Sequence, residues 1–487
     1  MIRGRRAWRA GLALTALQAL AWEASEAKLP SWAQEVADAA PPIPERFIED
    51  RSRVLYSFMR YEIRPDGSVE MLKRLAVQAL QAYPVDTRTG AFRFRPTMRV
   101  KASRAWHLRP DARSMRSYLP PIDLLVDTAF LGDTKVKIKP VEGTRKGSIV
   151  FFEFEAVDKP YFLSITHMFY EGAPMVRARL EVAAPPGWLV RSSWLRLQGP
   201  DPVVDGGAHV WELRDLQATR SEPLGPHPAD RAPFLAVQVA PPEGVVTEPA
   251  TFRDWTAVSE WYEGMVAGRH EASPAVERAA TQHMPESSAG FYERVLAAAR
   301  YVRDSVRYVA IELGLGGWRP HAASETLANL YGDCKDKGTL FRSLLAVRGI
   351  PSYPVLINLS IPDLVSRDVP VVAFNHFVVA VPVPDDAELP ASLAPAVVDA
   401  GDLGRLLFVD TTDEDTSIGY ISGELAGQLG LVVAGPHGRL VRLPDERPES
   451  HRLERRIRLE IRPDGSQAMH RSSSYYGQFA SIARGEY

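Results

Sequence analysis

Two hydrophobic periods divide the chain. From about Arg53 to Val239, short runs alternate apolar and polar residues, as in Ser148–Phe154 and Met175–Val182. Side chains of a β-strand point alternately to the two faces of its sheet, so this period predicts half-buried strands. Gly, Pro and Asp turns separate the runs, a spacing typical of a β-sandwich. We expect an all-β, sandwich-like N-terminal domain over residues 49–240.

A helical period begins after a proline-rich joint at residues 241–244. Helices are predicted near Trp255–Val266 and Gly290–Tyr308, and a third from Cys334 to Arg348, with Gly349 as its C-terminal stop. The apolar residues of the third helix recur at helical spacing: Leu340, Phe341, Leu344, Leu345 and Val347. With the strand-like runs around residues 376 and 408, these helices predict an α+β core over residues 241–430.

One short sequence occurs twice. Glu62–Ser68 and Glu460–Ser466 both read Glu-Ile-Arg-Pro-Asp-Gly-Ser. Pro-Asp-Gly between alternating apolar residues predicts a hairpin turn, although a common turn can also arise twice by chance. An isolated hairpin is only marginally stable in water. The second copy therefore predicts either strands that join another sheet or a C-terminal β region, residues 431–487, that is incomplete.

The first residues have the features of a targeting segment. Arginines at positions 3, 5, 6 and 9 precede an uncharged stretch from Ala10 to Trp22, and a small-x-small site follows at Ser25–Ala27. This pattern predicts a signal peptide over residues 1–27, with a short amphipathic or disordered segment as the alternative. The apolar stretch is shorter than the ~20 residues that span a bilayer. We expect a periplasmic or secreted protein, with a linker over residues 28–48 and no integral membrane span after signal removal.

Composition narrows the chemistry. With 45% hydrophobic and 24% charged residues, the chain is typical of globular proteins, and its formal net charge of −2 disfavours a nucleic-acid surface. Its single cysteine excludes an internal disulfide framework and a cysteine-rich zinc site. Zinc-protease, nucleotide-loop and serine-hydrolase motifs are all missing. We therefore expect no cofactor and no metal, and the oligomeric state is left open.

That single cysteine, Cys334, stands at the predicted start of the third helix. Asp333 is a good N-cap, and Asp336 suits the first turn. A helix start favours a thiolate, whereas the two aspartates oppose it, so a basic partner is needed. His376 is the candidate, and Lys335 can assist. A free cysteine is often only a small core residue, but charged neighbours disfavour that interpretation here.

Cysteine, histidine and aspartate then follow in the order of a nucleophile, its base and the group that orients the base. His376 opens one apolar run and Asp410 closes another. Each also has an ordinary structural interpretation, His376 as a buried strand residue and Asp410 as a turn residue. His321 is a weaker alternative base. Trp318 is a candidate substrate wall or second oxyanion donor, or equally a core aromatic.

The stretch from Ile311 to Ile350 resembles the transglutaminase-like superfamily. The resemblance rests on Gly-Trp-Arg-Pro-His at residues 317–321, Tyr-Gly-Asp-Cys-Lys-Asp-Lys at 331–337, the Asn-His pair ending at His376, and Val-Asp-Thr-Thr around Asp410. More narrowly, the chain resembles exported bacterial proteins that join an N-terminal domain of unknown function, DUF3857, to such a core. The resemblance implies a papain/transglutaminase-like α+β core, in which Cys334, His376 and Asp410 are catalytic. Gly338 replaces the usual alanine and Thr411 a frequent proline.

These features predict a thiol-dependent acyl-transfer enzyme acting on peptide or protein amides through a thioester. Water as the acceptor would make it a cysteine peptidase or amidase, which we favour, and an amine acceptor would make it a transglutaminase. No sequence feature marks an amine site, and the Pro- and Ala-rich stretch from Val383 to Gly404 is expected to be a mobile flap. A binding or assembly protein with a vestigial triad, and a structural envelope component, are the non-enzymatic alternatives.

Overall fold

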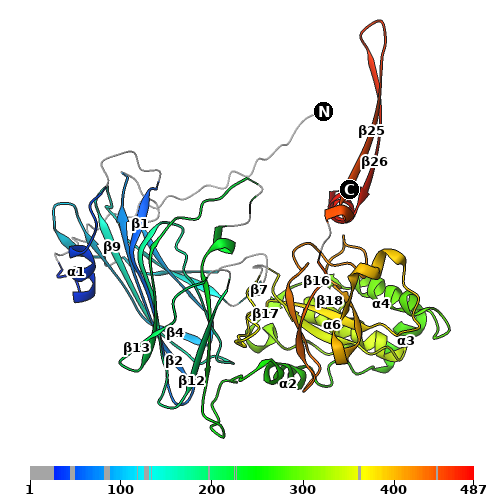
Figure 1. Cartoon of the computed structure of the whole chain (residues 1–487), viewed down its shortest axis with the longest axis horizontal. Helices are drawn as coiled ribbons and strands as arrows, with labels where there is room; N and C mark the ends of the chain where they lie inside the picture. The colour runs from blue at the N-terminus through cyan, green and yellow to red at the C-terminus, as the bar shows by residue number, and fades with distance from the viewer. Residues whose placement is uncertain are drawn as a thin grey trace, which may run out of the picture.

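The structure of the protein is a computed structural model that describes residues 27–43, 50–81, 88–117, 119–125, 131–132, 134–195, 198–223, 225, 228–359, 363–445 and 448–486. All but the last residue of the predicted signal peptide lies outside these ranges. The described chain is a sheet-rich mixture of strands and helices. One part, here called the β region, extends from β1 to β15. A second, the α+β region, follows it on the other side of the molecule (Figure 1).

An eight-stranded sheet forms most of the β region. Its neighbouring strands pair antiparallel, except β1 and β11, which run parallel. In spatial order the strands are β13 (Val203–Asp205), β14 (Ala208–Leu216), β11 (Met175–Ala183), β1 (Ser52–Ile63), β2 (Val69–Ala79), β9 (Ile149–Asp158), β4 (Met98–Leu108) and β5 (Ser114–Arg116).

A three-stranded sheet covers one face of the large sheet. It consists of β10 (Ile165–Met168), β15 (Phe234–Ala240) and β12 (Leu189–Leu195). Leu235, Val237 and Val239 of β15 share one core with Leu180 and Phe152 of the large sheet. The two sheets therefore share one hydrophobic core. A further three-stranded sheet consists of β3 (Thr89–Phe94), β8 (Lys135–Pro140) and β6 (Ile122–Leu125).

The segment predicted as a linker contains a helix, α1 (Ser31–Asp38). Trp32 of α1 packs edge-on against Trp106 and Phe151 on the other face of the large sheet. The sequence suggested no element here because the helix is short and proline-flanked. Its burial comes from a partner surface that local sequence does not reveal.

An antiparallel six-stranded sheet and five helices form the α+β region. The sheet order is β21 (Val397–Asp399), β22 (Arg405–Val409), β20 (His376–Pro382), β19 (Tyr353–Ile357), β23 (Leu429–Val432) and β24 (Arg439–Arg442). The helices are α2 (Trp255–Val266), α3 (Pro274–His283), α4 (Phe291–Ser305), α5 (Ala323–Asn329) and α6 (Cys334–Val347). Short pairs join β16 (Arg307–Tyr308) to β18 (Tyr331–Gly332), and β17 (Ile311–Glu312) to β7 (Leu131–Gly132).

The alternation along β20 shows how this sheet is buried. Phe377 and Val379 face the helices, whereas Val378 and Ala380 belong to a second core on the opposite face. The helices predicted near residues 255–266 and 290–308 are present as α2 and α4. The predicted core boundary at residue 430 falls inside β23, a strand that pairs with both β19 and β24 and so belongs to the same sheet.

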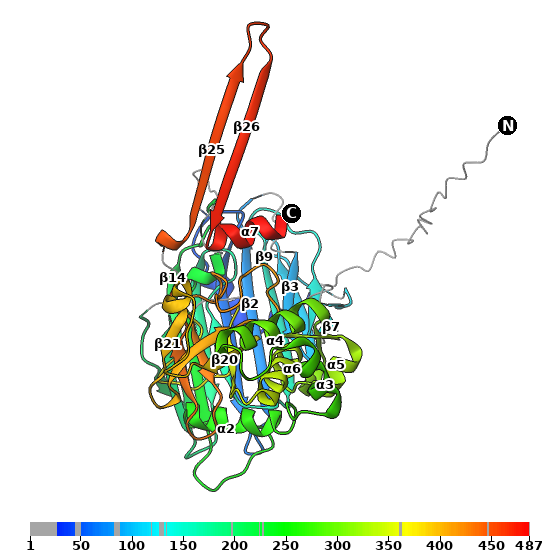
Figure 2. The ribbon, with the colours of Figure 1, turned by 90° about the vertical axis from the view of Figure 1, so that its right-hand side faces the viewer.

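The predicted flap differs from its prediction, whereas the repeated sequence agrees with it. The predicted flap from Val383 to Gly404 contains the 3₁₀ turns Ala391–Ala396 and Gly401–Leu403 and the edge strand β21, so it is built into the sheet. The repeated sequence forms the same turn twice, with Gly67 and Gly465 at positive φ, as predicted. The second copy joins β25 (Arg452–Ile461) to β26 (Gln467–Tyr476), an exposed ribbon that projects from the molecule and is followed by α7 (Gln478–Glu486) (Figures 1 and 2).

Candidate active site

The helix that carries Cys334 lies in the middle of the α+β region. It begins at Cys334, as predicted, and packs against α3, α4, α5 and β20. All residues from Cys334 to Leu345 are buried, so α6 has no exposed face over this length. The apolar spacing in the sequence identified the helix correctly, but the charged neighbours were taken as a reason against burial of Cys334. The charged residues around Cys334 are instead buried with it.

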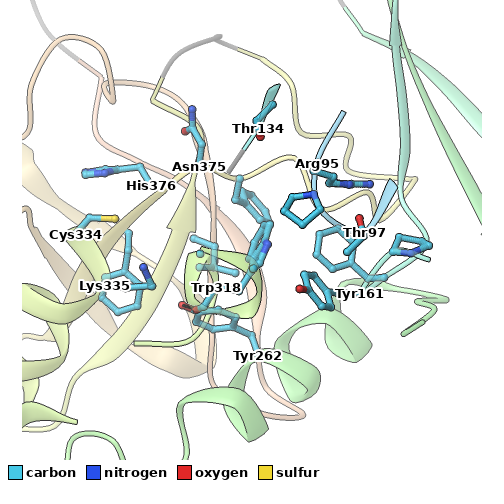
Figure 3. A pocket seen from close by; sticks show the side chains of 18 residues that line it. Arg95, Thr97, Thr134, Tyr161, Tyr262, Trp318, Cys334, Lys335, Asn375 and His376 are labelled. Atoms are coloured by element: carbon cyan, nitrogen blue, oxygen red, sulfur yellow. Dashed lines mark hydrogen bonds between the residues drawn. The ribbon is translucent and has the colours of Figure 1, made fainter. Parts of the chain in front are cut away.

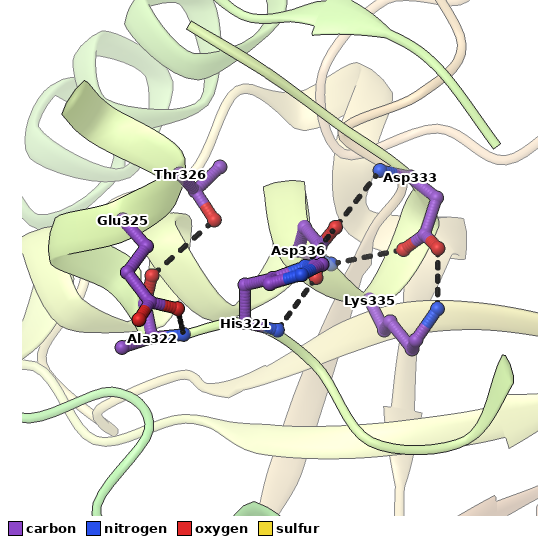
Figure 4. Close-up of polar contacts among 7 residues, drawn as sticks. All are labelled: His321, Ala322, Glu325, Thr326, Asp333, Lys335 and Asp336. Atoms are coloured by element: carbon purple, nitrogen blue, oxygen red, sulfur yellow. Dashed lines mark hydrogen bonds and ion pairs between the residues drawn. The ribbon is translucent and has the colours of Figure 1, made fainter. Parts of the chain in front are cut away.

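Reciprocal hydrogen bonds fix the start of α6 (Figure 4). The Asp333 carboxylate accepts from the Asp336 backbone N–H at 3.3 Å, and the Asp336 carboxylate accepts from the Asp333 N–H at 3.2 Å. Asp336 also accepts from the His321 backbone N–H at 2.8 Å. Asp333 is therefore the N-cap that the sequence predicted, and the cap fixes the backbone at Cys334.

Two buried lysines complete this motif. Lys335 Nζ pairs with the Asp333 carboxylate, and both side chains are almost inaccessible. Burial lowers the pKa of Lys335, but the nearby charges of Asp333 and Cys334 outweigh it and raise that pKa. Lys337 Nζ donates to the Val306 carbonyl oxygen at 2.7 Å, just beyond the carboxyl end of α4. The two lysines thus compensate the buried Asp333 carboxylate and the buried Val306 carbonyl. The charged neighbours of Cys334 are therefore compatible with its burial, contrary to the expectation from the sequence.

His376 and Asp410, the predicted base and its predicted orienting group, come from neighbouring strands. His376 is the first residue of β20, and Asp410 directly follows β22. His376 Nε2 lies 2.7 Å from Asp410 Oδ2, and both side chains are more than nine-tenths buried. Asp410 Oδ1 accepts from the Thr412 N–H at 2.8 Å and from the Thr412 hydroxyl at 2.6 Å. This arrangement fixes the imidazole and leaves Nδ1 of His376 for another partner.

That partner is Cys334. Burial lowers the pKa of His376, but the charge of Asp410 and hydrogen bonds to Asp410 and Cys334 raise it well above its ordinary value. For Asp410, burial raises the pKa, while the charge and hydrogen bond of His376 dominate and lower it. Both shifts favour the charged forms of His376 and Asp410. The structure brings together the three residues that the sequence placed in order.

Gly338, the departure from the usual alanine, has a direct structural reason. A Cβ atom on Gly338 would lie 2.3 Å from Cε1 and 2.7 Å from Cδ1 of the Phe377 ring. Phe377 is buried and directly follows His376. The glycine therefore allows α6 to approach the strand that carries the histidine. The sequence alone gave no reason to connect these two residues.

A cavity of about 240 Å³ opens at Cys334 and His376. Cys334 and His376 lie at one end, and Arg95 and Tyr161 at the other, with Trp318 between them (Figure 3). Trp318 lines the cavity and also packs against the hydrophobic core of the α+β region, so both of its predicted roles stay open. His321 does not line the cavity: its side chain is largely exposed, and Nδ1 lies 3.1 Å from Asp336 Oδ2.

Sequence reasoning missed the contribution of the β region to this cavity. Seven of the lining residues precede β10: Arg95, Pro96, Thr97, Thr134, Pro160, Tyr161 and Phe162. Phe162 meets Trp318 edge-on at a centroid distance of 5.0 Å. Backbone hydrogen bonds from Leu163 N–H to Ala250 and from Ala250 N–H to Tyr161 hold this segment in place. Only tertiary contacts reveal this wall, although the aromatic pair Tyr161-Phe162 was visible in the sequence.

Nowhere in the described ranges do three or more His, Cys, Asp or Glu side chains gather as they would around a metal ion. Among the helices of the same ranges, none combines the length and apolarity needed to cross a membrane.

Comparison with known proteins gives a likeness at the level of fold. No protein-family model matches the chain, and no curated protein matches it. A crystal structure of a candidate protease from Parabacteroides distasonis ATCC 8503 superposes with a TM-score of 0.58 at 13% identity, covering 81% of this chain and 72% of the other. This match supports a shared fold.

Two other solved structures also match part of the chain. Yeast LTA4 hydrolase in complex with bestatin has a TM-score of 0.23 at 6% identity, covering 43% of this chain and 33% of the other. The M1 zinc metallopeptidase of Deinococcus radiodurans has a TM-score of 0.22 at 10% identity, covering 45% and 54%. These scores are too low to indicate a common fold for the whole chain.

Proposed function

We propose that the protein is a thiol-dependent acyl-transfer enzyme, with Cys334 as nucleophile, His376 as acid and base, and Asp410 as the orienting group. The observation that carries the proposal is the 2.7 Å contact between His376 Nε2 and Asp410 Oδ2, with His376 and Cys334 lining the same cavity. The fold likeness to a candidate protease is consistent with it. A papain/transglutaminase-like core and an exported location belong to the same proposal.

In the proposed reaction, His376 takes the proton of the Cys334 thiol. Cys334 Sγ forms a bond to an amide carbonyl carbon, and the resulting oxyanion accepts a hydrogen bond from the Cys334 backbone N–H, which has no partner within the helix. The C–N bond then breaks, and His376 gives its proton to the leaving amine. A water molecule, deprotonated by His376, attacks the thioester, releases the carboxylic acid and returns the thiol.

Water is the acceptor that the cavity favours. None of its lining residues in the described chain is an aspartate or glutamate, so no carboxylate faces a lysine ammonium there. An amine acceptor must be held near the acyl carbon in competition with bulk water. The cavity offers aromatic rings and cationic side chains instead, which supports peptidase or amidase activity over transglutaminase activity.

Alkylation of the thiol tests the proposal directly. Because Cys334 is the only cysteine, every alkylated product reports this residue alone. A small haloacetamide at pH 5.5 should label the native protein rapidly, since thiolate is the reacting form. His376→Ala should label slowly, and Cys334→Ala not at all. Labelling of the native protein only after denaturation would mean that the cysteine is a core residue.

Turnover separates the enzymatic classes. Peptide amides are incubated with the protein and a fluorescent primary amine, and both products are followed by mass spectrometry. Release of free acid that disappears in Cys334→Ala is the expected result. Predominant amine incorporation would assign a transglutaminase. Rapid alkylation with neither product would instead favour a binding protein with a vestigial triad.

A further inference from the structure

The end of the cavity farthest from Cys334 presents a cation. Arg95 follows β3 and lies opposite Cys334 and His376 across the cavity (Figure 3). Its side chain is 47% exposed, and its one side-chain hydrogen bond to the described residues runs from Nη2 to Asp158 Oδ2 at 2.9 Å. A guanidinium has five N–H donors, so most of them are available to a ligand.

The partner of Arg95 is placed behind it. The Asp158 side chain is only 4% exposed and does not line the cavity that holds Cys334. It lines a neighbouring cavity of about 450 Å³, which shares Arg95 and Phe162 with the first. Asp158 thus fixes the guanidinium of Arg95, a residue that lines both cavities.

Between the two ends the cavity is aromatic. Its lining rings, the imidazole of His376 aside, belong to Tyr161, Phe162, Tyr262, Trp318, Phe374 and Phe377. Phe162 also packs against Trp261 at 5.4 Å, so the wall supplied by the β region is anchored in the α+β region. A volume of about 240 Å³ accommodates an extended peptide segment with one or two side chains, which excludes a folded partner from the interior.

We propose that this cavity selects peptides that carry a carboxylate, which Arg95 holds. In these peptides an apolar or aromatic residue separates the carboxylate from the reacting amide carbonyl. The inference rests on the proposed function and names its substrate class. Arg95 is the specificity-determining residue, because a guanidinium forms strong, directional hydrogen bonds with a carboxylate. A neutral amide at the same position lacks the charge, and an ammonium is repelled.

Matched peptides test this preference. Each fluorogenic peptide of a series contains one phenylalanine. A second residue, which is Glu, Gln or Lys, is placed at successive positions on either side of that phenylalanine. At the best position, the Glu peptide should show a kcat/KM about 10-fold or more above the Gln peptide, the usual effect of a hydrogen bond to a charged group, and the Lys peptide the lowest value. Arg95→Gln should remove the preference for Glu, Arg95→Lys should retain part of it, and Arg95→Glu should favour Lys.

Arg93→Gln is the control variant. It makes the same change of charge two residues away, at a side chain that does not line the cavity, and should keep the preference. Affinities of the same peptides for Cys334→Ala, measured by fluorescence anisotropy, report selection without turnover. Alkylation rates of Cys334 in each variant report whether the thiol site is intact.

The outcomes separate the two proposals. Equal turnover of the Glu, Gln and Lys peptides would overturn the carboxylate preference while leaving the enzymatic function standing. A preference that survives Arg95→Gln would overturn the role of Arg95. Loss of the proposed function itself would appear as slow alkylation of Cys334 and no cleavage of any peptide, a result that overturns this inference as well.

Discussion

Replacement of Gly338 by alanine sets two physical effects against each other. Within an exposed helix, Gly→Ala stabilises by about 1 kcal/mol, because alanine has the higher helix propensity. Gly338 is not exposed: a Cβ there would lie 2.3 Å from the ring of Phe377, whose side chain is buried on β20. Overpacking of a core typically costs about 1–3 kcal/mol. We expect the steric cost to win, with a net loss of up to about 2 kcal/mol.

A double-mutant cycle with Phe377→Leu isolates the contact. Leucine removes the ring edge that the new methyl group would meet, so Gly338→Ala should be neutral or stabilising in that background. The free energy of unfolding is followed by denaturant titration of the four proteins, and Cys334 alkylation reports whether His376 has moved. A gain in stability from Gly338→Ala in the native background would refute the reasoning, since it would mean that the Phe377 ring yields freely.

Three further predictions concern the buried charges. Folding raises the pKa of His376, so protonation of this residue stabilises the folded protein. The stabilisation is complete below about pH 6.5 and is lost as the pH rises through the folded-state pKa. His376→Gln should therefore flatten that part of a plot of unfolding midpoint against pH. Asp410→Asn should lower the pKa of His376 and slow alkylation at pH 5.5, whereas an unchanged rate would mean that another group orients the ring. Lys337→Met should lower the free energy of unfolding by about 1–3 kcal/mol, because the Val306 carbonyl loses its donor. The exposed control Lys146→Met should change it little. Denaturant titration measures both.

Local sequence predicted the features that depend on neighbouring residues. The hairpin turns need only Pro-Asp-Gly and a glycine at positive φ, and both copies have them. The start of α6 needs only the Asp333 cap and the periodic apolar residues after it. The order of Cys334, His376 and Asp410 indicated a site because each stands at the end of an element, where sheet and helix termini can meet.

Features that depend on distant contacts were not predictable in this way. The wall formed by Arg95 and Phe162 requires the β region to pack against Trp318, which no period in the sequence encodes. The segment from Val383 to Gly404 resembled a flap by composition, yet its short strand pairs with β22. Burial of Lys335 was unexpected because the sequence does not show that other elements enclose the start of α6. Once it is enclosed, Lys335 pairs with the buried Asp333 carboxylate.

If the proposed function holds, the shared wall makes peptide selection depend on an interface as well as on a fold. Phe162 lies among Phe252, Trp261 and Trp318, so separating the β region from the α+β region would remove one side of the cavity while leaving α6 and its cap intact. Heating should therefore abolish peptide selection at a lower temperature than it melts the helices. Between those temperatures the protein would keep a reactive thiol that no longer discriminates among its substrates.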